Sequence, residues 1–555
     1  MSINRREFLA GGALLGGAAL VGSLAACTKK EDDTSQTDIY PFGIDEADFA
    51  ASLAEIKPIT NISEEKTYDL VVIGAGTAGM PAVLTALEEG ATVACLQRES
   101  DGVSQGNGES GCILEESTPE GIRNFMNEWT RLSSYRVNRD LLNYFVKYSG
   151  ETACWLGRMG EVVGYLPSAQ NAGMTKTFPD GSVCAFATNN FGVKPENNGH
   201  LIKAMCRYAE ANGADMFYRT PGVQLVMEGG RAVAVIGKTE NDNYIKFNAT
   251  KGIIIATGDY QNNDNMVKKF SPDLAPFARK QYNKTGDGIL MAMAVGGHLT
   301  PVMHCKQMHD MDAAPMMFAN NPFLALDQKG KRFMNETVPM EQWNQVLRFQ
   351  DAADPGHFFR IFDSDYPSYT SEWGNPPVSV ESLENYIPGF KENPPGVYTD
   401  LIDTHRADSL DELAQQLGLD ASTFKASIDR YNQLCDQGND EDFGKPALYL
   451  RPIRTGPFWG IRQWIRITAI CGGIAVDENY QVVDANKNPI PGLYAAGFVA
   501  GDLSGDVDWS IYLGGLSCGS CFTSGRYTAV HALTGSDKPS RPVSWAEMKS
   551  IYMPQ

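Results

Sequence analysis

The sequence predicts an α/β fold whose first part is a Rossmann-like, dinucleotide-binding domain. The apolar run Tyr68–Ile73 is typical of a buried strand, and it leads directly into Gly74-Ala75-Gly76-Thr77-Ala78-Gly79. A helical stretch over 80–89 and a second apolar strand over 93–96 complete a strand–GxGxxG–helix–strand unit. Hydrophobic residues make up 43% of the 555 residues, which excludes a disordered chain. A chain of this length is expected to form about two to four structural units.

Each residue of the glycine loop has an expected role. Gly74 permits the tight turn, Gly76 lets the backbone approach a pyrophosphate, and Gly79 lets the helix pack on the strand. The helix N-terminus then presents its partial positive charge to the phosphates. All six residues of the loop are therefore predicted to bind the nucleotide. The second strand should end in an acidic residue for the ribose hydroxyls, but Gln97 stands there and offers only uncharged hydrogen bonds.

The overall charge excludes one class of partner. Lys and Arg number 47 against 67 Asp and Glu, a formal charge of −20. A nucleic-acid-binding protein needs a basic footprint, so no nucleic-acid partner is expected. Eleven cysteines are too sparse for a disulfide scaffold. Only Cys518 and Cys521 are closely spaced. This pair is either redox-active or packed in the core for structural reasons, and we favour the structural role. No metal site is predicted, although distant cysteines could still meet at an iron–sulfur cluster.

The N-terminal residues are predicted to form an export signal. Arg5 and Arg6 precede Phe8-Leu9 and an apolar run over 9–26, which resembles a twin-arginine signal. Leu24-Ala25-Ala26-Cys27 resembles a lipobox, so Cys27 is the predicted lipidation site and residues 1–27 the signal. The alternative is an ordinary signal peptide with an incidental cysteine. The polar segment 28–63 is predicted to be a tether. Because no other window approaches a membrane span, we expect an extracytoplasmic lipoprotein held at the cell membrane only by its lipid anchor.

Four later motifs point to a flavin cofactor. A buried strand over 251–255 ends in Ala256-Thr257-Gly258, and Thr285-Gly286-Asp287-Gly288 opens a helix. Further motifs follow at 491–497 and 512–517. In this order and spacing they resemble the fumarate reductase/succinate dehydrogenase flavoprotein family, which includes ketosteroid dehydrogenases. The resemblance extends from about residue 68 to residue 533.

The resemblance implies an FAD cofactor and a particular domain order. The FAD-binding domain would consist of residues 64–299 and 451–540, with a mobile α+β capping domain inserted over 300–450 and a tail over 541–555. Beyond the glycine loop and Gln97, the implied cofactor ligands are Gly106, Ser110, Gly111, Val223, Ala256, Thr257, Gly258, Asp287, Gly497, Leu516 and Ser517. The segment 103–111 has no histidine for covalent attachment, so the FAD is expected to be non-covalent. Glu109 lies in this segment, and we expect it to point to solvent.

The substrate positions depart from the family pattern. Met340, Ala469 and Tyr512 stand where the family has an arginine, a histidine and an arginine, whereas His309 keeps the family's Gln-x-His motif. Losing these cations leaves a dicarboxylate without bidentate partners, so an apolar or aromatic substrate is predicted. Arg462 and Arg466 are assigned to the substrate site, where they hold one carboxylate or carbonyl group. A structural ion pair is the equal alternative.

Two residues compete for the proton-donating role. Tyr512 would protonate the substrate or polarise its carbonyl group while flavin N5 supplies the hydride. The alternative is that Tyr512 only packs beneath the flavin. His309 is the rival donor, because its reference pKa lies near neutrality.

The sequence thus predicts an exported FAD-dependent reductase of an activated C=C bond, of enone, lactone or aryl acrylate type. It resembles the exported flavin reductases of anaerobic gut bacteria. Because the chain has no haem-attachment motif and no second nucleotide unit, a separate cytochrome or quinol system is the expected electron donor. The alternatives are a ketosteroid-type dehydrogenase working in the opposite direction and a non-catalytic flavin electron carrier.

Overall fold

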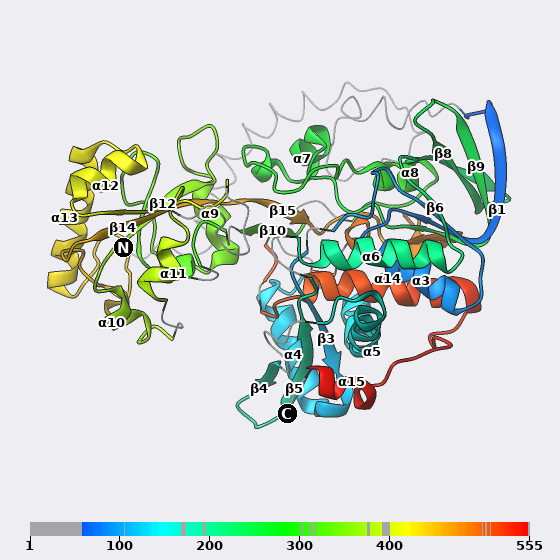
Figure 1. Ribbon diagram of the computed structural model, residues 1–555, viewed down its shortest axis with the longest axis horizontal. Helices are drawn as coiled ribbons and strands as arrows, with labels where there is room; N and C mark the ends of the chain where they lie inside the picture. Colours follow the sequence, from blue (N-terminus) through cyan, green and yellow to red (C-terminus); the bar gives the residue numbers. More distant parts are fainter. Residues whose placement is uncertain are drawn as a thin grey trace, which may run out of the picture. The chain divides into compact units, whose positions relative to one another are not determined.

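A mostly parallel sheet forms the centre of the larger domain in the computed structural model (Figure 1). Its strand order is β16-β17-β9-β1-β2-β6, and β8 joins β9 and β7 at the side. β1 pairs in parallel with β2 and β9, and β9 pairs in parallel with β17. The strands are β1 (Ile62–Ile73), β2 (Val93–Leu96), β6 (Asp215–Phe217), β7 (Gly222–Glu228), β8 (Arg231–Lys238), β9 (Tyr244–Ile255), β16 (Gln481–Val483) and β17 (Pro489–Ala495).

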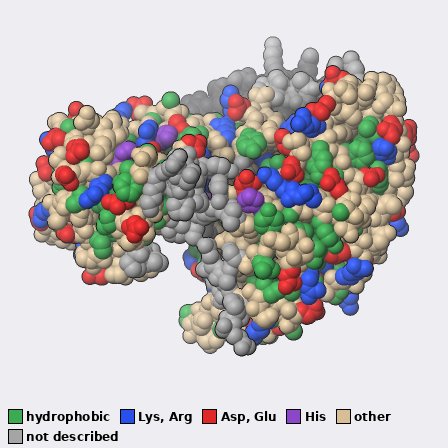
Figure 2. Space-filling model, viewed as in Figure 1, with side chains coloured by type: hydrophobic (Ala, Val, Ile, Leu, Met, Phe, Trp, Pro, Cys, Tyr) green, Lys and Arg blue, Asp and Glu red, His purple; other side chains and the backbone are tan. Residues whose placement is uncertain are grey.

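The structure describes residues 58–104, 106–167, 174–192, 196–300, 304–309, 312–315, 318–374, 378–390, 400–501, 503–504, 508–510 and 512–552. The predicted signal segment, Cys27 and most of the predicted tether therefore lie outside the described residues. Within them, no helix is long and apolar enough to cross a membrane. On the face that Figure 2 presents, acidic and basic side chains are interspersed rather than separated into single-sign patches.

Helices cover the central sheet and hold the two halves of this domain together. In Figure 1, α3 (Gly79–Glu88), α6 (Asn198–Ala211) and α14 (Leu516–Thr534) lie side by side, and α14 also contacts α5 (Arg139–Val163). The fully buried Arg526 of α14 connects this helix to α3 and α5, because its guanidinium binds Glu88 of α3 at 2.8 Å and Glu151 of α5 at 2.9 Å. The other helices are α4 (Pro119–Leu132), α7 (Asp264–Phe270), α8 (Asp287–Ala294) and α15 (Trp545–Tyr552).

Two smaller sheets lie beside the central sheet in the larger domain. One has three antiparallel strands in the order β3-β5-β4 and packs on α5; its strands are β3 (Glu109–Ile113), β4 (Met174–Thr177) and β5 (Val183–Asn189). The other pairs β10 (Lys306–His309) with β15 (Arg466–Ile470). Because β10 and β15 come from segments about 160 residues apart in the sequence, their pairing brings together side chains that no local motif connects.

The inserted part is a four-stranded antiparallel sheet covered by short helices. Its strand order is β11-β12-β14-β13, with β11 (Leu324–Leu326), β12 (His357–Asp363), β13 (Thr404–Ala407) and β14 (Phe458–Trp464). Its helices are α9 (Trp343–Leu347), α10 (Tyr366–Thr370), α11 (Val380–Glu384), α12 (Leu410–Leu417) and α13 (Ala421–Gln437). The predicted break at Gly418 is present, since Gly418 caps α12 at φ 71°. β14 belongs to this sheet although it follows residue 450. The predicted fold class, a Rossmann-like domain with an α+β insertion, is confirmed.

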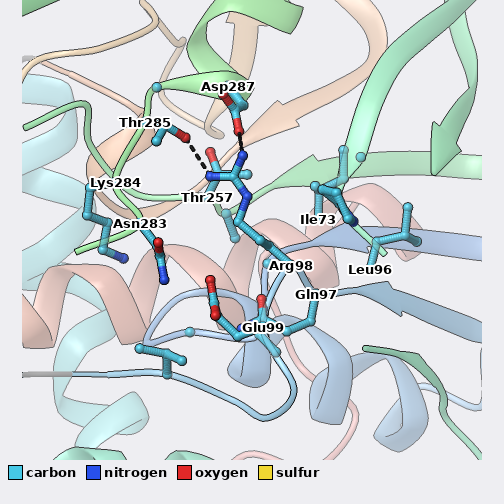
Figure 3. A pocket seen from close by; sticks show the side chains of 18 of the residues that line it. Ile73, Leu96, Gln97, Arg98, Glu99, Thr257, Asn283, Lys284, Thr285 and Asp287 are labelled. Carbon is cyan, nitrogen blue, oxygen red and sulfur yellow. Dashed lines mark hydrogen bonds and ion pairs between the residues drawn. The ribbon is translucent and has the colours of Figure 1, made fainter. Parts of the chain in front are cut away.

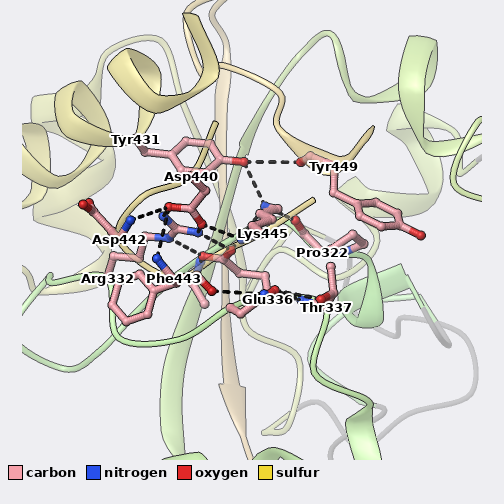
Figure 4. Close-up of polar contacts among 12 residues, drawn as sticks. Pro322, Arg332, Glu336, Thr337, Tyr431, Asp440, Asp442, Phe443, Lys445 and Tyr449 are labelled. Atoms are coloured by element: carbon pink, nitrogen blue, oxygen red, sulfur yellow. Dashed lines mark hydrogen bonds and ion pairs between the residues drawn. The ribbon is translucent and has the colours of Figure 1, made fainter. Parts of the chain in front are cut away.

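A buried ionic network fixes the inserted sheet internally (Figure 4). Arg332 donates two hydrogen bonds to Glu336, both of 2.9 Å, and two to Asp440, of 2.9 and 2.7 Å. Lys445 lies 3.3 Å from Glu336 and donates to the Tyr431 hydroxyl at 2.9 Å. Burial lowers the pKa of Lys445 to about 8. Removing one partner of such a buried set would leave an unpaired buried charge, so the network should be costly to disrupt.

Candidate active site

Two adjoining cavities lie at the carboxyl ends of the parallel strands. The first, here called the nucleotide cavity, is lined by the glycine loop, the end of β2 and the segment 282–287 (Figure 3). The second, here called the reaction cavity, is lined by residues from β10, β15 and the N-terminus of α14. Four residues line both cavities: Gly76, Val103, Ala256 and Lys284. The two cavities therefore form one elongated site, as an extended dinucleotide requires.

The glycine loop approaches its surroundings so closely that side chains would not fit. A Cβ atom at Gly74 would lie 2.5 Å from the carbonyl oxygen of Ala256, and Gly74 has φ +107°. A Cβ atom at Gly79 would lie 1.7 Å from the Gly74 oxygen. Gly74 thus makes the turn and Gly79 the helix–strand contact, while Gly76 lines both cavities. The side-chain hydroxyl of Thr257 is buried in the nucleotide cavity without a hydrogen-bond partner in the described part of the chain. Both features fit an FAD lying along the site.

Most of the sequence-predicted cofactor residues line these cavities. In the nucleotide cavity these are Gly74, Ala75, Gly76, Gln97, Ala256, Thr257 and Asp287. In the reaction cavity they are Gly76, Thr77, Ala78, Gly106, Ala256, Gly258, Gly497 and Ser517. The predicted residues that line neither cavity are Gly79, Ser110, Gly111, Val223 and Leu516.

These remaining residues have other positions in the fold. A Cβ atom at Gly111 would lie 2.1 Å from the carbonyl oxygen of Ser149, so Gly111 lets β3 pack on α5. Ser110 donates a hydrogen bond to the carbonyl oxygen of Gly514, next to the first turn of α14. Val223 follows the cavity-lining Gly222 on β7, and Leu516 is fully buried at the start of α14. Ser110 and Gly111 thus support the cavity wall from behind.

Gln97 and Arg98 shape the nucleotide cavity. The buried Gln97 accepts a hydrogen bond from the Ala75 amide at 3.1 Å and donates one to the Asp101 carbonyl oxygen at 2.9 Å. Its side chain therefore holds the glycine loop. Arg98 contacts Asp287 at 2.7 Å and the Thr285 hydroxyl at 2.7 Å (Figure 3). This pair joins the end of β2 to the first turn of α8.

The reaction cavity is built on the β10–β15 pair. Gln307, Met308 and His309 line it from β10, and Thr468 and Ala469 line it from β15. Gln307 pairs with Ala469 and Met308 with Ile467, so a bulge leaves Thr468 without a partner residue in the ladder. Bulges re-aim side chains beside active sites. The hydroxyl of Thr468 and Nδ1 of His309 are both buried without a hydrogen-bond partner among the described residues, which leaves polar groups for a ligand.

Burial, more than the nearby charges, decides the protonation of His309. Burial, and after it the positive charges of Lys280 and Arg466, lower the pKa of His309 to about 3. Lys280 lines the reaction cavity and lies 3.4 Å from Asp312. The imidazole is therefore neutral near pH 7. In that state one ring nitrogen donates and the other accepts a hydrogen bond.

The predicted arginines and Met340 do not line the cavity. Arg466 is buried, lies over the Trp464 ring at 4.5 Å and reaches Asp312 at 4.0 Å. Arg462 is exposed on β14. Met340 is buried, but its neighbour Glu341 lines the cavity. Of the substrate positions assigned from sequence, the structure thus brings Ala469 and His309 together and leaves Arg462, Arg466 and Met340 outside the lining.

Tyr512 lies in a different cavity from His309. It shares that cavity with residues of α4 and of the β4–β5 hairpin, among them Glu128, Arg131 and Asp180. Its ring stacks on Phe125 at 5.8 Å, and the Lys176 ammonium lies 3.7 Å above it. Burial, and next the charge of Glu128, raise the pKa of Tyr512. The structure therefore does not bring the two predicted proton donors together.

Glu109 is buried, so the expectation that it points to solvent is wrong. Only 1% of the residue is exposed, because α5 and α14 both pack on β3. Its carboxyl group accepts a hydrogen bond from Asn189 at 2.7 Å. Burial raises the pKa of Glu109 to about 8. The group is therefore mostly protonated near neutrality.

Sequence reasoning missed several cavity residues. Lys280, Lys284 and Glu341 line the reaction cavity, and Glu99 lines the nucleotide cavity. Lys284 directly precedes the Thr285–Gly288 motif, which was an available signal. Cys518 and Cys521 also line the reaction cavity as free thiols. Burial raises the pKa of Cys518 to about 11, which keeps the thiol protonated. No group of three or more metal-ligating side chains occurs in the described ranges.

Comparisons with known proteins agree with this site. Residues 69–517, more than half of the chain, match a family model described as an FAD binding domain. The chain is 28% identical over 504 residues to a vinyl phenol reductase of Lactiplantibacillus plantarum, covering 85% of this chain and 97% of that protein. It is 25% identical to a fumarate reductase (cytochrome) of Shewanella frigidimarina, covering 89% and 81%.

The fold also resembles that of a solved structure. An open conformation of a flavocytochrome c3 fumarate reductase matches with a TM-score of 0.66 at 20% identity, over 91% of this chain and 85% of that one. The family match establishes FAD as the cofactor, and the two joined cavities are consistent with it. The chain therefore belongs to the fumarate reductase/succinate dehydrogenase flavoprotein family, and it is an FAD-dependent oxidoreductase that acts on CH–CH groups.

Proposed function

We propose that the protein reduces a C=C bond conjugated to a carbonyl or aryl group, and that fumarate is a poor substrate. One observation carries this proposal: no arginine lines the reaction cavity among the described residues. Ala469 lines this cavity at the position where the family resemblance implies a cationic histidine that binds the substrate. A dicarboxylate would lose its hydration there without bidentate partners. The relative named vinyl phenol reductase, a name that indicates a phenolic substrate, also supports an aromatic substrate.

The residues of the cavity suit a flat substrate with one polar end. FAD, when bound in the site, would supply a hydride from flavin N5 to one carbon of the double bond, and the other carbon would take up a proton from water. Met308, Trp509 and Leu513 offer apolar surface for the carbon skeleton. Neutral His309 and the Thr468 hydroxyl are placed to donate hydrogen bonds to a substrate oxygen as negative charge develops on it. Lys280 adds a positive charge on the same side of the cavity.

An anaerobic assay with reduced methyl viologen tests this proposal. The FAD-loaded protein should oxidise the dye when given an enone such as benzylideneacetone or an aryl acrylate such as cinnamate. Fumarate should support at least tenfold less turnover, because a second carboxylate finds no arginine. Turnover of fumarate above every enone and acrylate would contradict the proposal. No turnover with any alkene would favour a non-catalytic flavin carrier. Faster oxidation of a saturated ketone with an oxidised dye would favour the ketosteroid-type dehydrogenase.

We also propose that electrons reach the flavin from a separate cytochrome or quinol system. The relative named fumarate reductase (cytochrome) supports a donor of this class. The chain itself has no haem-attachment motif of the CxxCH type. Membranes with reduced quinol should therefore reduce the bound flavin, whereas NADH alone should not.

The location is a further proposal, which rests on residues outside the described part of the chain. Arg5→Lys combined with Arg6→Lys should keep the protein inside the cell, because the twin-arginine pair is the export address. Cys27→Ala should release the exported protein from the membrane fraction, because it removes the site of the lipid. Cell fractionation measures both. Unchanged fractionation of the two variants would refute the lipoprotein assignment.

The FAD is expected to be non-covalent. The segment 103–111, which includes the cavity-lining Gly106, contains no histidine to which the flavin could be attached. Acid precipitation of the purified protein should therefore leave the yellow flavin in the supernatant. Flavin that stays with the pellet and migrates with the polypeptide in a denaturing gel would contradict this prediction.

A further inference from the structure

The adenosine end of the nucleotide cavity has an acidic residue that the sequence pattern does not assign. The expected position at the end of β2 holds Gln97. Both ends of the Gln97 amide are engaged within the protein, by the Ala75 amide at 3.1 Å and the Asp101 carbonyl oxygen at 2.9 Å. An uncharged side chain already used in this way is a weak partner for ribose hydroxyls. A charged acceptor for the ribose would therefore have to be a residue other than Gln97.

Glu99 supplies a carboxylate to the same cavity. It lies two residues after Gln97, in the loop that leaves β2, and it lines the nucleotide cavity. Figure 3 shows its side chain beside the cavity, on the side of Asn283. The main-chain oxygen of Glu99 accepts a hydrogen bond from the Arg219 amide at 3.0 Å, which fixes the loop. In the described part of the chain, the carboxylate itself has no hydrogen bond or ion pair.

The neighbouring cation does not neutralise Glu99. Arg98 turns its guanidinium to Asp287 at 2.7 Å and to the Thr285 hydroxyl at 2.7 Å. The charge of Arg98 is thus paired with Asp287 on the far wall of the cavity. Arg98 is therefore not a partner of Glu99, and the Glu99 carboxyl group remains a hydrogen-bond acceptor that no described residue of the protein uses.

We propose that Glu99 accepts hydrogen bonds from the adenosine ribose hydroxyls of FAD. The glycine loop places the pyrophosphate, and the ribose follows it toward the end of β2, where a carboxylate is the preferred partner of vicinal hydroxyls. Gln97 then has a different task, since it holds the glycine loop in shape. The proposal concerns FAD binding only and does not depend on the identity of the alkene substrate.

A binding cycle with two ligands tests this assignment. The full-length protein, freed of flavin, is titrated with FAD and with an FAD analogue whose adenosine lacks the 2′ and 3′ hydroxyls. The wild-type protein should bind the analogue about tenfold more weakly than FAD. Glu99→Gln should bind FAD about tenfold more weakly than the wild type does. Because both changes remove the same contact, the variant should bind FAD and the analogue equally.

The other outcomes overturn the proposal. Unchanged FAD affinity in Glu99→Gln would remove Glu99 from the site. Weaker FAD binding with an undiminished preference over the analogue would place the contact at the adenine instead. Glu89→Gln is the matched control: it removes the same charge at the C-terminal end of α3, where Glu89 binds the Ser540 amide outside both cavities. If the control loses as much FAD affinity as Glu99→Gln does, the loss comes from the change in net charge and not from a contact with the ribose. That result would also overturn the assignment.

Discussion

Replacing His309 with leucine should lower kcat/KM for an enone or aryl acrylate by about 10²–10³-fold without changing the FAD content. His309 lines the reaction cavity, and its Nδ1 has no hydrogen-bond partner among the described residues. Its imidazole is therefore available to a substrate oxygen. Leucine fills a similar volume and removes that hydrogen bond. Viologen-driven turnover and the flavin absorbance of the purified variant measure the two quantities.

Tyr512→Phe is the matched comparison. The phenol lies with Glu128 and Arg131 in a cavity other than the one that His309 lines, so loss of its hydroxyl should change turnover less than threefold. A nearly inactive Tyr512→Phe together with an active His309→Leu would reverse this assignment. It would restore the role that the sequence pattern gave to Tyr512.

The pH dependence separates two roles for His309. Because burial, Lys280 and Arg466 lower its pKa to about 3, the neutral ring is present throughout the range from about pH 5 to pH 8. A hydrogen-bond donor of this kind produces no inflection in kcat/KM over that range. A proton donor titrating near its reference pKa of about 6.5 would lose activity as the pH rises through that value. An inflection near pH 6.5 that disappears in His309→Leu would contradict the neutral role.

The fold could be predicted from the sequence because its signals are local. The run Tyr68–Ile73, the glycine loop and the strand over 93–96 lie within 30 residues, and each has a direct steric reason. The substrate end of the site could not be predicted in this way. It depends on the register of β10 against β15, which places Thr468 at a bulge opposite the Gln307–Met308 step. No periodicity in either strand contains that information.

Tyr512 and Glu109 show that the direction of a side chain could not be predicted from a sequence motif. Tyr512 lies one residue before the cavity-lining Leu513, yet its side chain packs on Phe125 of α4. Glu109 is charged in the sequence and follows the cavity-lining Gly108, yet it is buried beneath α5 and α14. In both cases the neighbouring residue in the chain lines the cavity. Side-chain direction was decided by packing against elements distant in sequence, which a motif does not record.

The buried carboxyl group of Glu109 should make the protein less stable as the pH rises from about 4.5 to about 8. Burial raises its pKa to about 8, and the Asn189 hydrogen bond only partly opposes this shift. The folded protein therefore holds the proton over a range in which the unfolded chain has released it. Since the folded state binds more protons, the free energy of unfolding falls with rising pH in this window. The groups that face Glu109 from the packed helices are the thiols of Cys154 and Cys518 and the phenol of Tyr552, which are neutral in the same range.

Glu109→Gln should remove this penalty. The amide oxygen of glutamine can still accept the Asn189 hydrogen bond, and the new side chain has no charge to bury. At about pH 9 the variant should be more stable than the wild type by on the order of 3 kcal/mol, whereas at about pH 5 the two should differ little. Urea unfolding of the FAD-loaded proteins at both pH values measures the difference.

Glu116→Gln provides a control of opposite sign. Glu116 is exposed, and its hydrogen bonds from Lys549 and Trp545 lower its pKa. Its contribution to stability is therefore present above about pH 4.5 and is lost as the pH falls. Glu116→Gln should be slightly less stable than the wild type at about pH 9, where Glu109→Gln is more stable. If Glu109→Gln instead destabilises the protein equally at both pH values, the carboxyl group is ionised and paired in the folded state, and the stability of the wall behind the reaction cavity depends on that charge.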